Sequence, residues 1–361
     1  MNLNILVLPG DGIGPEVTRQ AVLVLRHVSN KWKHAVKLTE GLLGGIAIHK
    51  TGSPMPDATA ELAAPADATL LGAVGLPEFD DYPPEQRPER GLLGIRKAMG
   101  VYANLRPVRA YPSLLDSSPL KNALVEGTDM IIVRELTGGI YYGTPRGISG
   151  TGPETRAINT MTYTQAEIER VARTAFHLAR GRRKKLTSVD KSNVLENSQL
   201  WRRVVTEVGR EYSDVTLDHI LVDNCAMQLI LNPRRFDVVL TENMFGDILS
   251  DEAAVLAGSI GMLPSASIGE RKASGVWVGL YEPVHGSAPD IAGQNKANPL
   301  GAIGSVAAML EYSFGLKEEA AAVYHAVEQV LGTGKVTADL RPSGNPATTE
   351  QVGEAVCAAI G

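Results

Sequence analysis

Residues Ile5–Val17 read ILVLPGDGIGPEV, and this stretch decides the fold class. It starts as an apolar run that is typical of a buried strand and then passes through a turn with three glycines. It continues into a helix whose first turn contains Pro15 and Glu16, two residue types suited to that position. Helical periodicity extends through residues 17–28. The stretch therefore predicts a strand–turn–helix unit.

The three glycines of this turn, Gly10, Gly12 and Gly14, invite comparison with dinucleotide-binding turns. Their spacing is G-x-G-x-G, whereas the Rossmann fingerprint is G-x-G-x-x-G. No acidic residue about 20 positions later ends a second strand, as a Rossmann unit requires. We therefore expect the glycines to serve the backbone of a tight turn, and we do not predict a Rossmann domain.

Further along the chain, apolar β-rich runs alternate with amphipathic stretches. This alternation predicts an α/β architecture with a largely buried sheet. Residues 76–91 are dense in proline and charge, and we expect a long loop there. No composition shift or low-complexity linker marks a domain boundary, so we expect interwoven lobes. The β-rich runs are ATLLGAVG, DMIIVREL, KLTSVD, HILVDN, FDVVLTEN and VWVGLYEP.

Composition narrows the class of protein. The 361 residues are 44% hydrophobic and 21% charged, enough for two lobes with apolar cores. A net charge of −5 argues against nucleic acid as a partner. The two cysteines, Cys225 and Cys357, are too few for a disulfide framework and fit a reducing cytoplasm. No run approaches the roughly 18 apolar residues of a membrane span, and no signal-peptide pattern is present. We expect a soluble, unprocessed, cytoplasmic protein.

Residues 241–252, TENMFGDILSDE, place three acids just after an apolar strand. If a helix begins near Met244, Asp247 and Asp251 are four residues apart and share one face, while Glu252 points elsewhere. Two carboxylates on one face repel each other unless a positive charge lies between them. The pattern fits a solvated helix start, and it equally fits half of a divalent metal site.

Three arginines lie in structured contexts: Arg96 in GLLGIRKAMG, Arg106 in VYANLRPVR and Arg134 at the end of an apolar strand. Each one alone is typical of a surface ion pair. Because guanidinium groups are preferred partners of carboxylates, three together would suit a substrate with two carboxylates.

With these stretches in view, the chain resembles the isocitrate/isopropylmalate dehydrogenase family of metal-dependent β-decarboxylating dehydrogenases. The resemblance runs in order over essentially the whole chain. It implies a two-lobed, open α/β/α fold with a large mixed sheet. It further implies a large cofactor-binding lobe of residues 1–101 plus 258–361, and a second lobe of residues 102–257 with the dimer contacts and the metal and catalytic residues. The motifs that carry the resemblance are GDGIGPEV, GLLGIRK, ANLRP, VRELTGGIYYG, SVDKSNVLE, LVDNCAMQL, TENMFGDILSDE, GSIGMLPSAS and EPVHGSAPDIAG.

The resemblance implies roles for individual residues. Members similar to this chain are homodimers whose active sites are shared between subunits. In them a 2-hydroxy acid is oxidised by NAD⁺ and then loses CO₂, with Mg²⁺ or Mn²⁺ as Lewis acid. The residues that match are Lys191 and Tyr141 as the acid/base pair; Asp247, Asp251 and, from the partner, Asp223 as metal ligands; and Arg96, Arg106 and Arg134 as receptors of the substrate carboxylates.

The substrate within the family depends on the surroundings of its C3 substituent. Leu92 and Leu93 precede Arg96 by one helical turn, and core packing is the simpler account of such a pair. The resemblance places them, with Val194 of the other subunit, around an isopropyl group, as in members that act on 3-isopropylmalate in leucine biosynthesis. Burying a carboxylate there would cost several kcal/mol, whereas burying an isopropyl group gains roughly 2 kcal/mol. The alternatives are a sister enzyme for another 3-substituted malate, tartrate or homoisocitrate, and a non-catalytic regulatory subunit.

The resemblance also indicates NAD as the nucleotide. Asp290 can accept hydrogen bonds from a free ribose 2′-hydroxyl and would repel a 2′-phosphate. Leu76, Glu78 and Lys296 depart from the usual pattern of the cofactor-side loops. The positions that match cofactor contacts are Ile13, Gly75, Glu89, Asn193, His285, Gly286, Ser287, Ala288, Asp290, Ile291 and Asn298.

Overall fold

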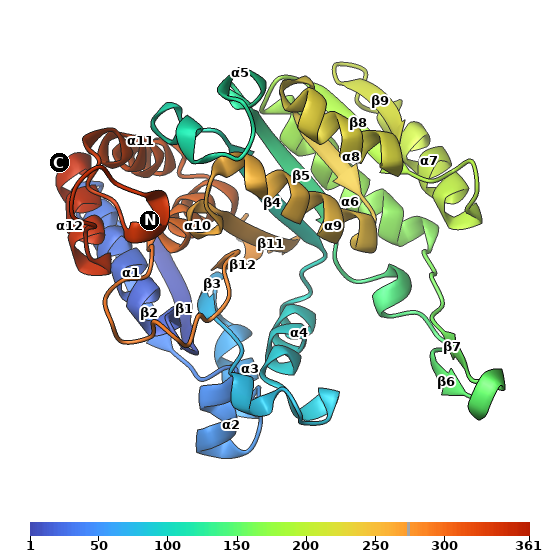
Figure 1. Ribbon diagram of the computed structural model, residues 1–361, viewed down its shortest axis with the longest axis horizontal. Helices are drawn as coiled ribbons and strands as arrows, with labels where there is room; N and C mark the ends of the chain where they lie inside the picture. Colours follow the sequence, from blue (N-terminus) through green and yellow to red (C-terminus); the bar gives the residue numbers. More distant parts are fainter. Residues whose placement is uncertain (273–274) are drawn as a thin grey trace. The chain divides into compact units, whose positions relative to one another are not determined.

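The opening stretch folds as its sequence predicts: strand β1 (Asn2–Gly10), a tight turn, and helix α1 (Gly14–Lys31) (Figure 1). The computed structural model describes residues 1–272 and 275–361. A Cβ added at Gly14 would lie 2.2 Å from the carbonyl oxygen of Pro9 and 2.8 Å from the amide nitrogen of Ala73. Gly12 has a φ of +56° and packs against the backbone of Ser287. The glycines therefore allow backbone segments to approach closely, as expected.

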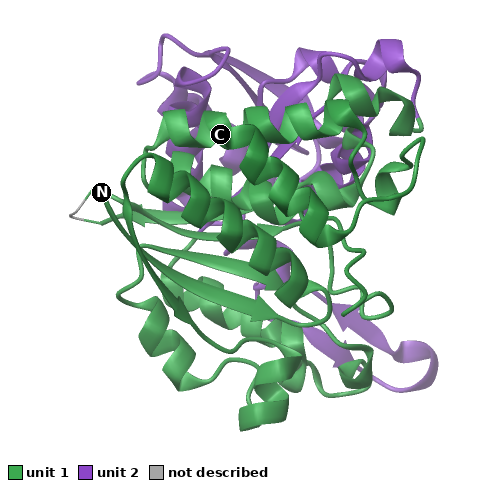
Figure 2. Ribbon diagram, turned by 90° about the vertical axis from the view of Figure 1, so that its left-hand side faces the viewer, with its two compact units in different colours: residues 1–101, 111–119, 257–361 green, residues 102–110, 120–256 purple. Residues whose placement is uncertain are grey.

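The chain forms two compact units, which Figure 2 colours separately. Unit 1 contains residues 1–101, 111–119 and 257–361, and unit 2 contains residues 102–110 and 120–256. The family resemblance implies lobe boundaries at residues 101/102 and 257/258. Both chain ends lie in unit 1, so the two units are interwoven along the sequence.

Unit 1 is built on five strands in the order β2-β1-β3-β12-β11. The first four run parallel, and β11 pairs antiparallel with β12. Strand β3 is buried along its whole length, which fits its mostly apolar sequence. The bounds are β2 (Ala35–Glu40), β3 (Ala68–Ala73), β11 (Pro264–Arg271) and β12 (Trp277–Pro283), with helices α2 (Gly45–Thr51), α3 (Asp57–Ala63), α4 (Pro88–Met99), α10 (Leu300–Tyr312), α11 (Lys317–Thr333) and α12 (Thr349–Ile360).

Unit 2 is built on five strands in the order β4-β5-β10-β8-β9. Strand β4 is antiparallel to β5, and the other four are parallel. A short antiparallel hairpin, β6 with β7, stands apart from this sheet. The bounds are β4 (Ala103–Arg109), β5 (Asp129–Glu135), β6 (Gly147–Ser149), β7 (Arg156–Ile158), β8 (Lys185–Asp190), β9 (Thr216–Leu221) and β10 (Val238–Thr241), with helices α5 (Asn122–Val125), α6 (Gln165–Arg180), α7 (Glu196–Gly209), α8 (Val222–Leu231) and α9 (Asn243–Ala254).

The helices divide by how much of their surface is apolar. Helix α10 is buried from Leu300 to Leu310 without interruption, as its almost wholly apolar sequence requires. Helix α6 is amphipathic and begins with a capping box between Thr164 and Glu167, which satisfies backbone groups at its first turn. These helices, together with the parallel and antiparallel strands described above, confirm the α/β class and the mixed sheet.

Two local expectations need correction, and one strand was not predicted. Residues 88–91, expected in a long loop, form the first turn of α4, because Pro88 suits a helix start. The run HILVDN reads as a strand, but β9 ends at Leu221 and Asp223 lies in the first turn of α8. Strand β4 contains Pro107, a residue that disfavours strands, and the sequence analysis did not predict it. Among the residues described, no helix is long and apolar enough to cross a membrane.

The close approach at Gly14 yields a stability prediction. We expect Gly14→Ala to lower the free energy of unfolding by roughly 3 kcal/mol, because the added methyl group meets backbone atoms that cannot move aside. Gly332→Ala in α11 is the matched control: nothing lies within 4 Å of the added Cβ. This control should raise the stability by about 0.5–1 kcal/mol. Urea unfolding measures both, and equal midpoints for Gly14→Ala and wild type would contradict the account.

Candidate functional site

The four parallel strands of unit 2 end in chemically functional residues. Arg134 lies at the end of β5, opposite Thr241 at the end of β10. Lys191 directly follows β8, and Asp223 is the second residue after β9. Because neighbouring parallel strands end at the same sheet edge, these residues occupy the edge at which open α/β sheets bind ligands.

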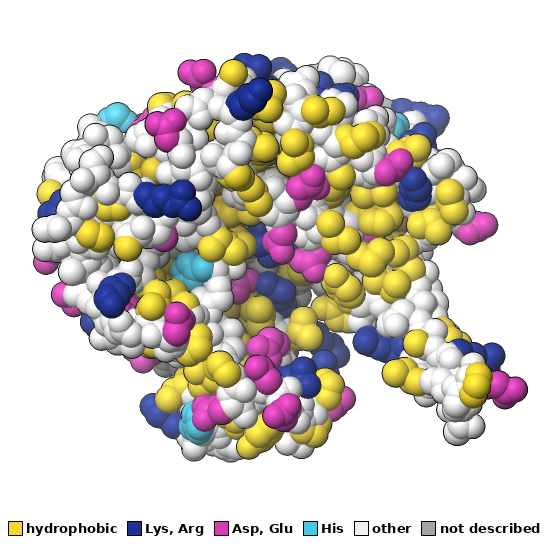
Figure 3. All heavy atoms as spheres, viewed as in Figure 1, with side chains coloured by type: hydrophobic (Ala, Val, Ile, Leu, Met, Phe, Trp, Pro, Cys, Tyr) yellow, Lys and Arg dark blue, Asp and Glu magenta, His cyan; other side chains and the backbone are white. Residues whose placement is uncertain are grey.

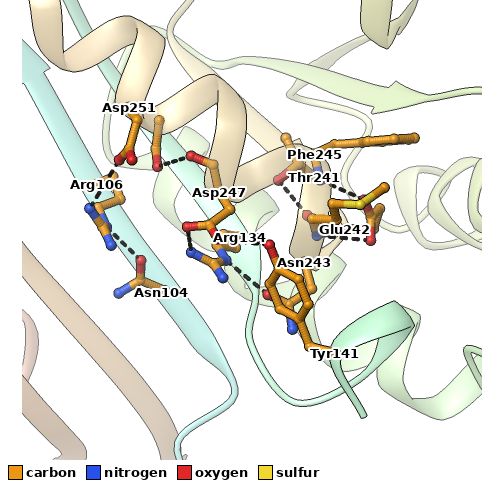
Figure 4. A network of polar contacts seen from close by, with 12 residues as sticks. Asn104, Arg106, Arg134, Tyr141, Thr241, Glu242, Asn243, Phe245, Asp247 and Asp251 are labelled. Carbon is orange, nitrogen blue, oxygen red and sulfur yellow. Dashed lines mark hydrogen bonds and ion pairs between the residues drawn. The ribbon is translucent and has the colours of Figure 1, made fainter. Parts of the chain in front are cut away.

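The carboxylate of Asp247 accepts two side-chain hydrogen bonds, one on each oxygen (Figure 4). Nη1 of Arg134 donates to Oδ1, and the hydroxyl of Tyr141 donates to Oδ2 at 2.9 Å. The Arg134 guanidinium also lies 5.8 Å from the centre of the Tyr141 ring. Since Arg134 is only 8% exposed, its charge depends on such partners.

Helix α9 is fixed at its start by buried polar groups. The carboxylate of Glu242 accepts from the backbone N–H groups of Phe245 at 2.6 Å and Met244 at 3.1 Å. The side chain of Asn243 accepts from Nε of Arg134 at 2.9 Å and donates to the carbonyl of Gly138 at 3.0 Å. These bonds set the direction of the helix that carries Asp247 and Asp251.

Gly246 lets Arg134 lie directly against α9. A Cβ at Gly246 would lie 2.7 Å from Cβ and Cγ of Arg134 and 2.3 Å from Oγ1 of Thr241. Glycine, the only residue type without a Cβ, is therefore needed where the side chain of Arg134 crosses α9.

The turn that leads to Tyr141 is held by the buried carboxylate of Glu135, and the start of α9 is held by the buried hydroxyl of Tyr163. Glu135 accepts from the backbone N–H of Thr137 at 3.0 Å and of Gly138 at 2.8 Å. The hydroxyl of Tyr163 donates to Glu242 at 3.2 Å and accepts from the N–H of Asn243 at 2.9 Å. Burial raises the pKa values of both the Glu135 and the Glu242 carboxyl groups, although nearby hydrogen bonds oppose the shift.

The pKa of Tyr141 is raised above its ordinary value of 10.0. Partial burial is the main cause, and the hydrogen bond to the negatively charged Asp247 adds to it. Tyr141 therefore stays a protonated donor over the neutral range and remains 41% exposed at the site.

Arg106 and Asp251 extend this cluster. Nε of Arg106 donates to Asn104 at 2.8 Å, and Nη1 lies 3.9 Å from Oδ1 of Asp251. The Asp251 side chain is 71% exposed, so its oxygens are open to a ligand. Glu252 is different: burial raises its pKa, and its charge acts on Cys225 of α8. It thus faces away from the cluster, as its place on the helix predicts.

Lys191 and Asp223 form a second pair. Nζ of Lys191 donates to Oδ1 of Asp223 at 2.7 Å, and this contact lowers the pKa of the Asp223 carboxyl group. The backbone of Lys191 is fixed from both sides. Its N–H donates to Ser198 at 3.0 Å, and the preceding Asp190 is buried and bound by Arg202 at 2.8 Å. Within one chain, and over residues 1–272 and 275–361, no three acidic, histidine or cysteine side chains gather as a metal site.

Helix α4 of unit 1 contains three further residues that match substrate contacts, Leu92, Leu93 and Arg96. Nη2 of Arg96 donates to Glu282 at 2.5 Å, while its Nε is buried without a hydrogen-bond partner among the described residues. Leu92 packs partly against the apolar core of unit 1, and Leu93 is 38% exposed. An unpaired buried guanidinium nitrogen is a donor that a bound carboxylate can satisfy.

Several expected cofactor residues meet in unit 1. The N–H of Ile13 donates to the carbonyl of Ser287 at 2.8 Å. A Cβ built at Gly75, whose φ is +123°, would lie 3.1 Å from Glu89 and 3.7 Å from the Ser287 hydroxyl. Nε2 of His285 is buried and has no partner in the described part of the chain, and burial lowers the pKa of this histidine. A neutral imidazole with one free nitrogen can bind a ligand.

Other expected cofactor positions have varied surroundings. Asn298 is buried and donates to Asp339 at 2.9 Å, which ties the end of the loop to the fold. Gly286 and Asp290 are exposed, whereas Ala288 and Ile291 are half-buried. In unit 2, Asn193 is exposed beside Lys191, and so is Val194, which matches a substrate contact.

Three residues that depart from the usual pattern of the cofactor-side loops take part in local contacts of unit 1. Glu78 pairs with His49 at 2.7 Å, and Nζ of Lys296 donates to Gln294 at 2.8 Å. Leu76 packs so closely on Gly45 that a Cβ there would lie 2.6 Å from it.

Three buried residues that support the site were not predicted from the sequence. Glu242, Asn243 and Tyr163 are buried and bind one another across 80 residues of sequence. Glu242 could have been found as an acid directly between a strand and a helix, a position that favours an N-cap. Nothing near Tyr163 in the sequence indicates its partners.

Comparison with known proteins places this geometry in a family. Residues 4–356 match the family model described as isocitrate/isopropylmalate dehydrogenase. A 3-isopropylmalate dehydrogenase of Geobacillus kaustophilus is 59% identical over 355 residues, covering 98% of this chain and 94% of the relative. One of Priestia megaterium is 55% identical over 360 residues, covering 100% and 96%.

Solved structures agree with the sequence relatives. The isocitrate dehydrogenase of Methylococcus capsulatus superposes with a TM-score of 0.85 at 34% identity, covering 99% of each chain. A β-decarboxylating dehydrogenase of Thermococcus kodakarensis gives a TM-score of 0.81 at 36% identity, covering 99% of this chain and 96% of that one. The chain therefore belongs to the isocitrate/isopropylmalate dehydrogenase family, and it is an oxidoreductase of a family that depends on NAD and a divalent metal ion.

Proposed function

We propose that the protein catalyses the NAD-dependent oxidative decarboxylation of (2R,3S)-3-isopropylmalate to 4-methyl-2-oxopentanoate, a step of leucine biosynthesis. The observation that carries this proposal is the Asp247 carboxylate, which binds a carboxylate-receptor arginine and a tyrosine proton donor at the carboxyl edge of the sheet. Relatives over 50% identical across nearly the whole chain are named 3-isopropylmalate dehydrogenases, which supports the choice of substrate.

Asp247 and Asp251, with Asp223 of a second subunit, are the ligands that would hold Mg²⁺ or Mn²⁺. Carboxylate oxygens suit these hard cations. Two observations support this fit. The oxygens of Asp247 accept hydrogen bonds from a cationic guanidinium and a phenol hydroxyl, as expected of an anionic ligand. The Asp251 carboxylate is mostly exposed. When bound, such an ion supplies Lewis acidity toward the oxygens of the substrate.

The chain's own residues manage carboxylates and protons. Arg96, Arg106 and Arg134 bind the two substrate carboxylates. Lys191, as the neutral amine that a nearby divalent cation would favour, accepts the proton of the C2 hydroxyl as hydride leaves C2 for NAD⁺. After CO₂ is lost, C3 needs a proton, and the hydroxyl of Tyr141 donates it. The raised pKa of Tyr141 keeps that proton available at neutral pH.

The C3 substituent would meet Leu92 and Leu93, together with Val194 of the other subunit. Leu93 and Val194 are 38% and 61% exposed in the single chain, so both offer apolar surface to a ligand or partner. An isopropyl group gains free energy there, while a third carboxylate would lack a cation.

Loop residues 285–298, together with Ile13, Gly75 and Glu89, would hold NAD. The unpaired Nε2 of His285 and the exposed carboxylate of Asp290 support this assignment. Asp290 disfavours the 2′-phosphate of NADP, since two negative charges would face each other. By this proposal, residues 1–101 and 258–361 form the cofactor lobe, and residues 102–257 form the catalytic and dimerisation lobe.

A homodimer in the cytoplasm completes the proposal. In unit 2, helices α8 and α9 expose Met227, Leu231 and Ile248, each by more than half of its surface. Figure 3 shows hydrophobic side chains gathered over these helices. Exposed apolar patches of this kind mark interfaces. Because Lys191 is bound to Asp223, a partner that donates Asp223 would also donate Lys191.

The proposal predicts NADH formation from 3-isopropylmalate that requires metal and prefers this substrate. A chelator should lower the rate at least ~100-fold, and added Mg²⁺ or Mn²⁺ should restore it. Asp251→Asn should have an effect of similar size, whereas Glu252→Gln, one residue away and facing Cys225, should keep the rate within about twofold. Faster turnover of isocitrate, tartrate or homoisocitrate, or no turnover at all, would contradict the proposed function.

The environment of Tyr141 predicts a pH titration. In the metal-free protein, ultraviolet absorbance of wild type minus Tyr141→Phe should show Tyr141 ionising above the ordinary pKa of 10.0. Asp247→Asn should lower this pKa, because it removes the negative charge that opposes ionisation, and Glu252→Gln should leave it in place. An ordinary pKa in wild type, or no response to Asp247→Asn, would refute the assigned contact.

A further inference from the structure

The proposed chemistry makes little use of two acids near the start of the chain, Asp11 in the turn after β1 and Glu16 in the first turn of α1. Asp11 is buried, and its carboxylate accepts from the backbone N–H groups of Gly45 and Ile46 at 2.8 Å and of Gly75 at 2.9 Å. Asp11 thus ties the Gly75 turn to the start of helix α2. Its bonds are all internal, and a structural role accounts for them.

Glu16 reaches a different segment, 277 residues further along the chain. One oxygen of its carboxylate accepts from the backbone N–H of Gly293, and the other accepts from the N–H of Asn295 at 2.9 Å. Gly293 and Asn295 have φ values of +75° and +57°, so this piece of backbone is strongly curved. A single carboxylate therefore holds two donors of one tight turn.

The turn belongs to loop residues 285–298, which contain neither helix nor strand. In Figure 1 the loop is the orange segment that runs beside the blue helix α1. Its far end is held by α12: Asn295 accepts from the N–H of Thr349 at 3.0 Å and donates to Glu350 at 3.1 Å. Glu16 is the tie on the α1 side, two residues from Gly14 at the helix start.

We infer that Glu16 is a positioning residue for the nucleotide: it holds the 285–298 loop in the conformation that receives the adenosine half of NAD. The inference rests on the proposed function, which assigns this loop to NAD and its Asp290 to the ribose 2′-hydroxyl of that half. A loop without secondary structure loses conformational entropy when it is ordered for binding. Because Glu16 orders the loop before the nucleotide binds, it increases nucleotide affinity without contacting the reacting atoms.

Substitutions at Glu16 should act in graded fashion. Alanine removes both acceptors. Glutamine keeps one carbonyl oxygen, but its amide N–H group would face the second backbone N–H, so one of the two bonds is lost. Both variants should weaken nucleotide binding, alanine more than glutamine, and neither should alter the hydride transfer itself.

The test is calorimetric titration of the intact protein with NADH and with ADP-ribose, which lacks the nicotinamide ring. For Glu16→Ala we expect Kd to rise about tenfold for both ligands, with Glu16→Gln between this variant and wild type. In turnover, KM for NAD⁺ should rise in parallel, while kcat and KM for the hydroxy acid stay within about twofold. Hydrogen exchange should show lost protection at Gly293 and Asn295.

Glu167→Gln is the matched control. Its carboxylate also accepts a backbone N–H, that of Thr164 at 2.8 Å, at the start of a helix in unit 2. It should leave both Kd values unchanged. Should Glu16→Ala fail to fold, Glu16→Gln carries the test.

Unchanged NADH affinity in a folded Glu16 variant, or a fall in kcat at constant KM for NAD⁺, would overturn the inference while leaving the proposed function intact. Failure of the wild-type protein to bind NADH would overturn both.

Discussion

The Asp247 carboxylate is the contact on which the rest of the site depends. It neutralises the nearly buried Arg134, fixes the hydroxyl of Tyr141, and stands on a helix whose first turn is capped by Glu242. A buried guanidinium without a partner would be strongly unfavourable, so the pair stabilises the arrangement as well as serving chemistry. Gly246 makes the contact possible, since any side chain there would push Arg134 away from α9.

Parallel strand order explains why residues far apart in sequence act together. Strands β5, β10, β8 and β9 are neighbours, and each places a polar residue at or just beyond its carboxyl end. Strands β5, β10 and β8 supply rigidity, because their side chains are almost wholly buried. Unit 1 uses its first turn in a comparable way, where the backbone of Ile13 and the carboxylate of Glu16 hold the loop proposed for the nucleotide.

The sequence allowed the α/β class, the strand–turn–helix start and the shared face of Asp247 and Asp251 to be predicted, because these depend on local periodicity. It did not predict the Tyr163–Glu242–Asn243 contacts or the bond from Glu16 to the 293–295 backbone. Those join positions about 80 and 280 residues apart, and no local pattern records such pairings. Strand β4 was not predicted either: it contains Pro107, which locally disfavours a strand, and pairing with β5 nevertheless forms it. The exclusion of a Rossmann turn succeeded because glycine spacing is itself local.

The central claim is that one active site takes Asp247 from one subunit and Lys191, with Asp223, from the other. Subunit complementation tests it most directly. Asp247→Asn and Lys191→Ala homodimers, each inactive, are mixed, dissociated and reassociated. Random pairing makes half of the dimers mixed, each with one intact site of two, so activity should return to about a quarter of the wild-type value. Absence of any recovery, with mixed dimers demonstrated by mass, would contradict the account.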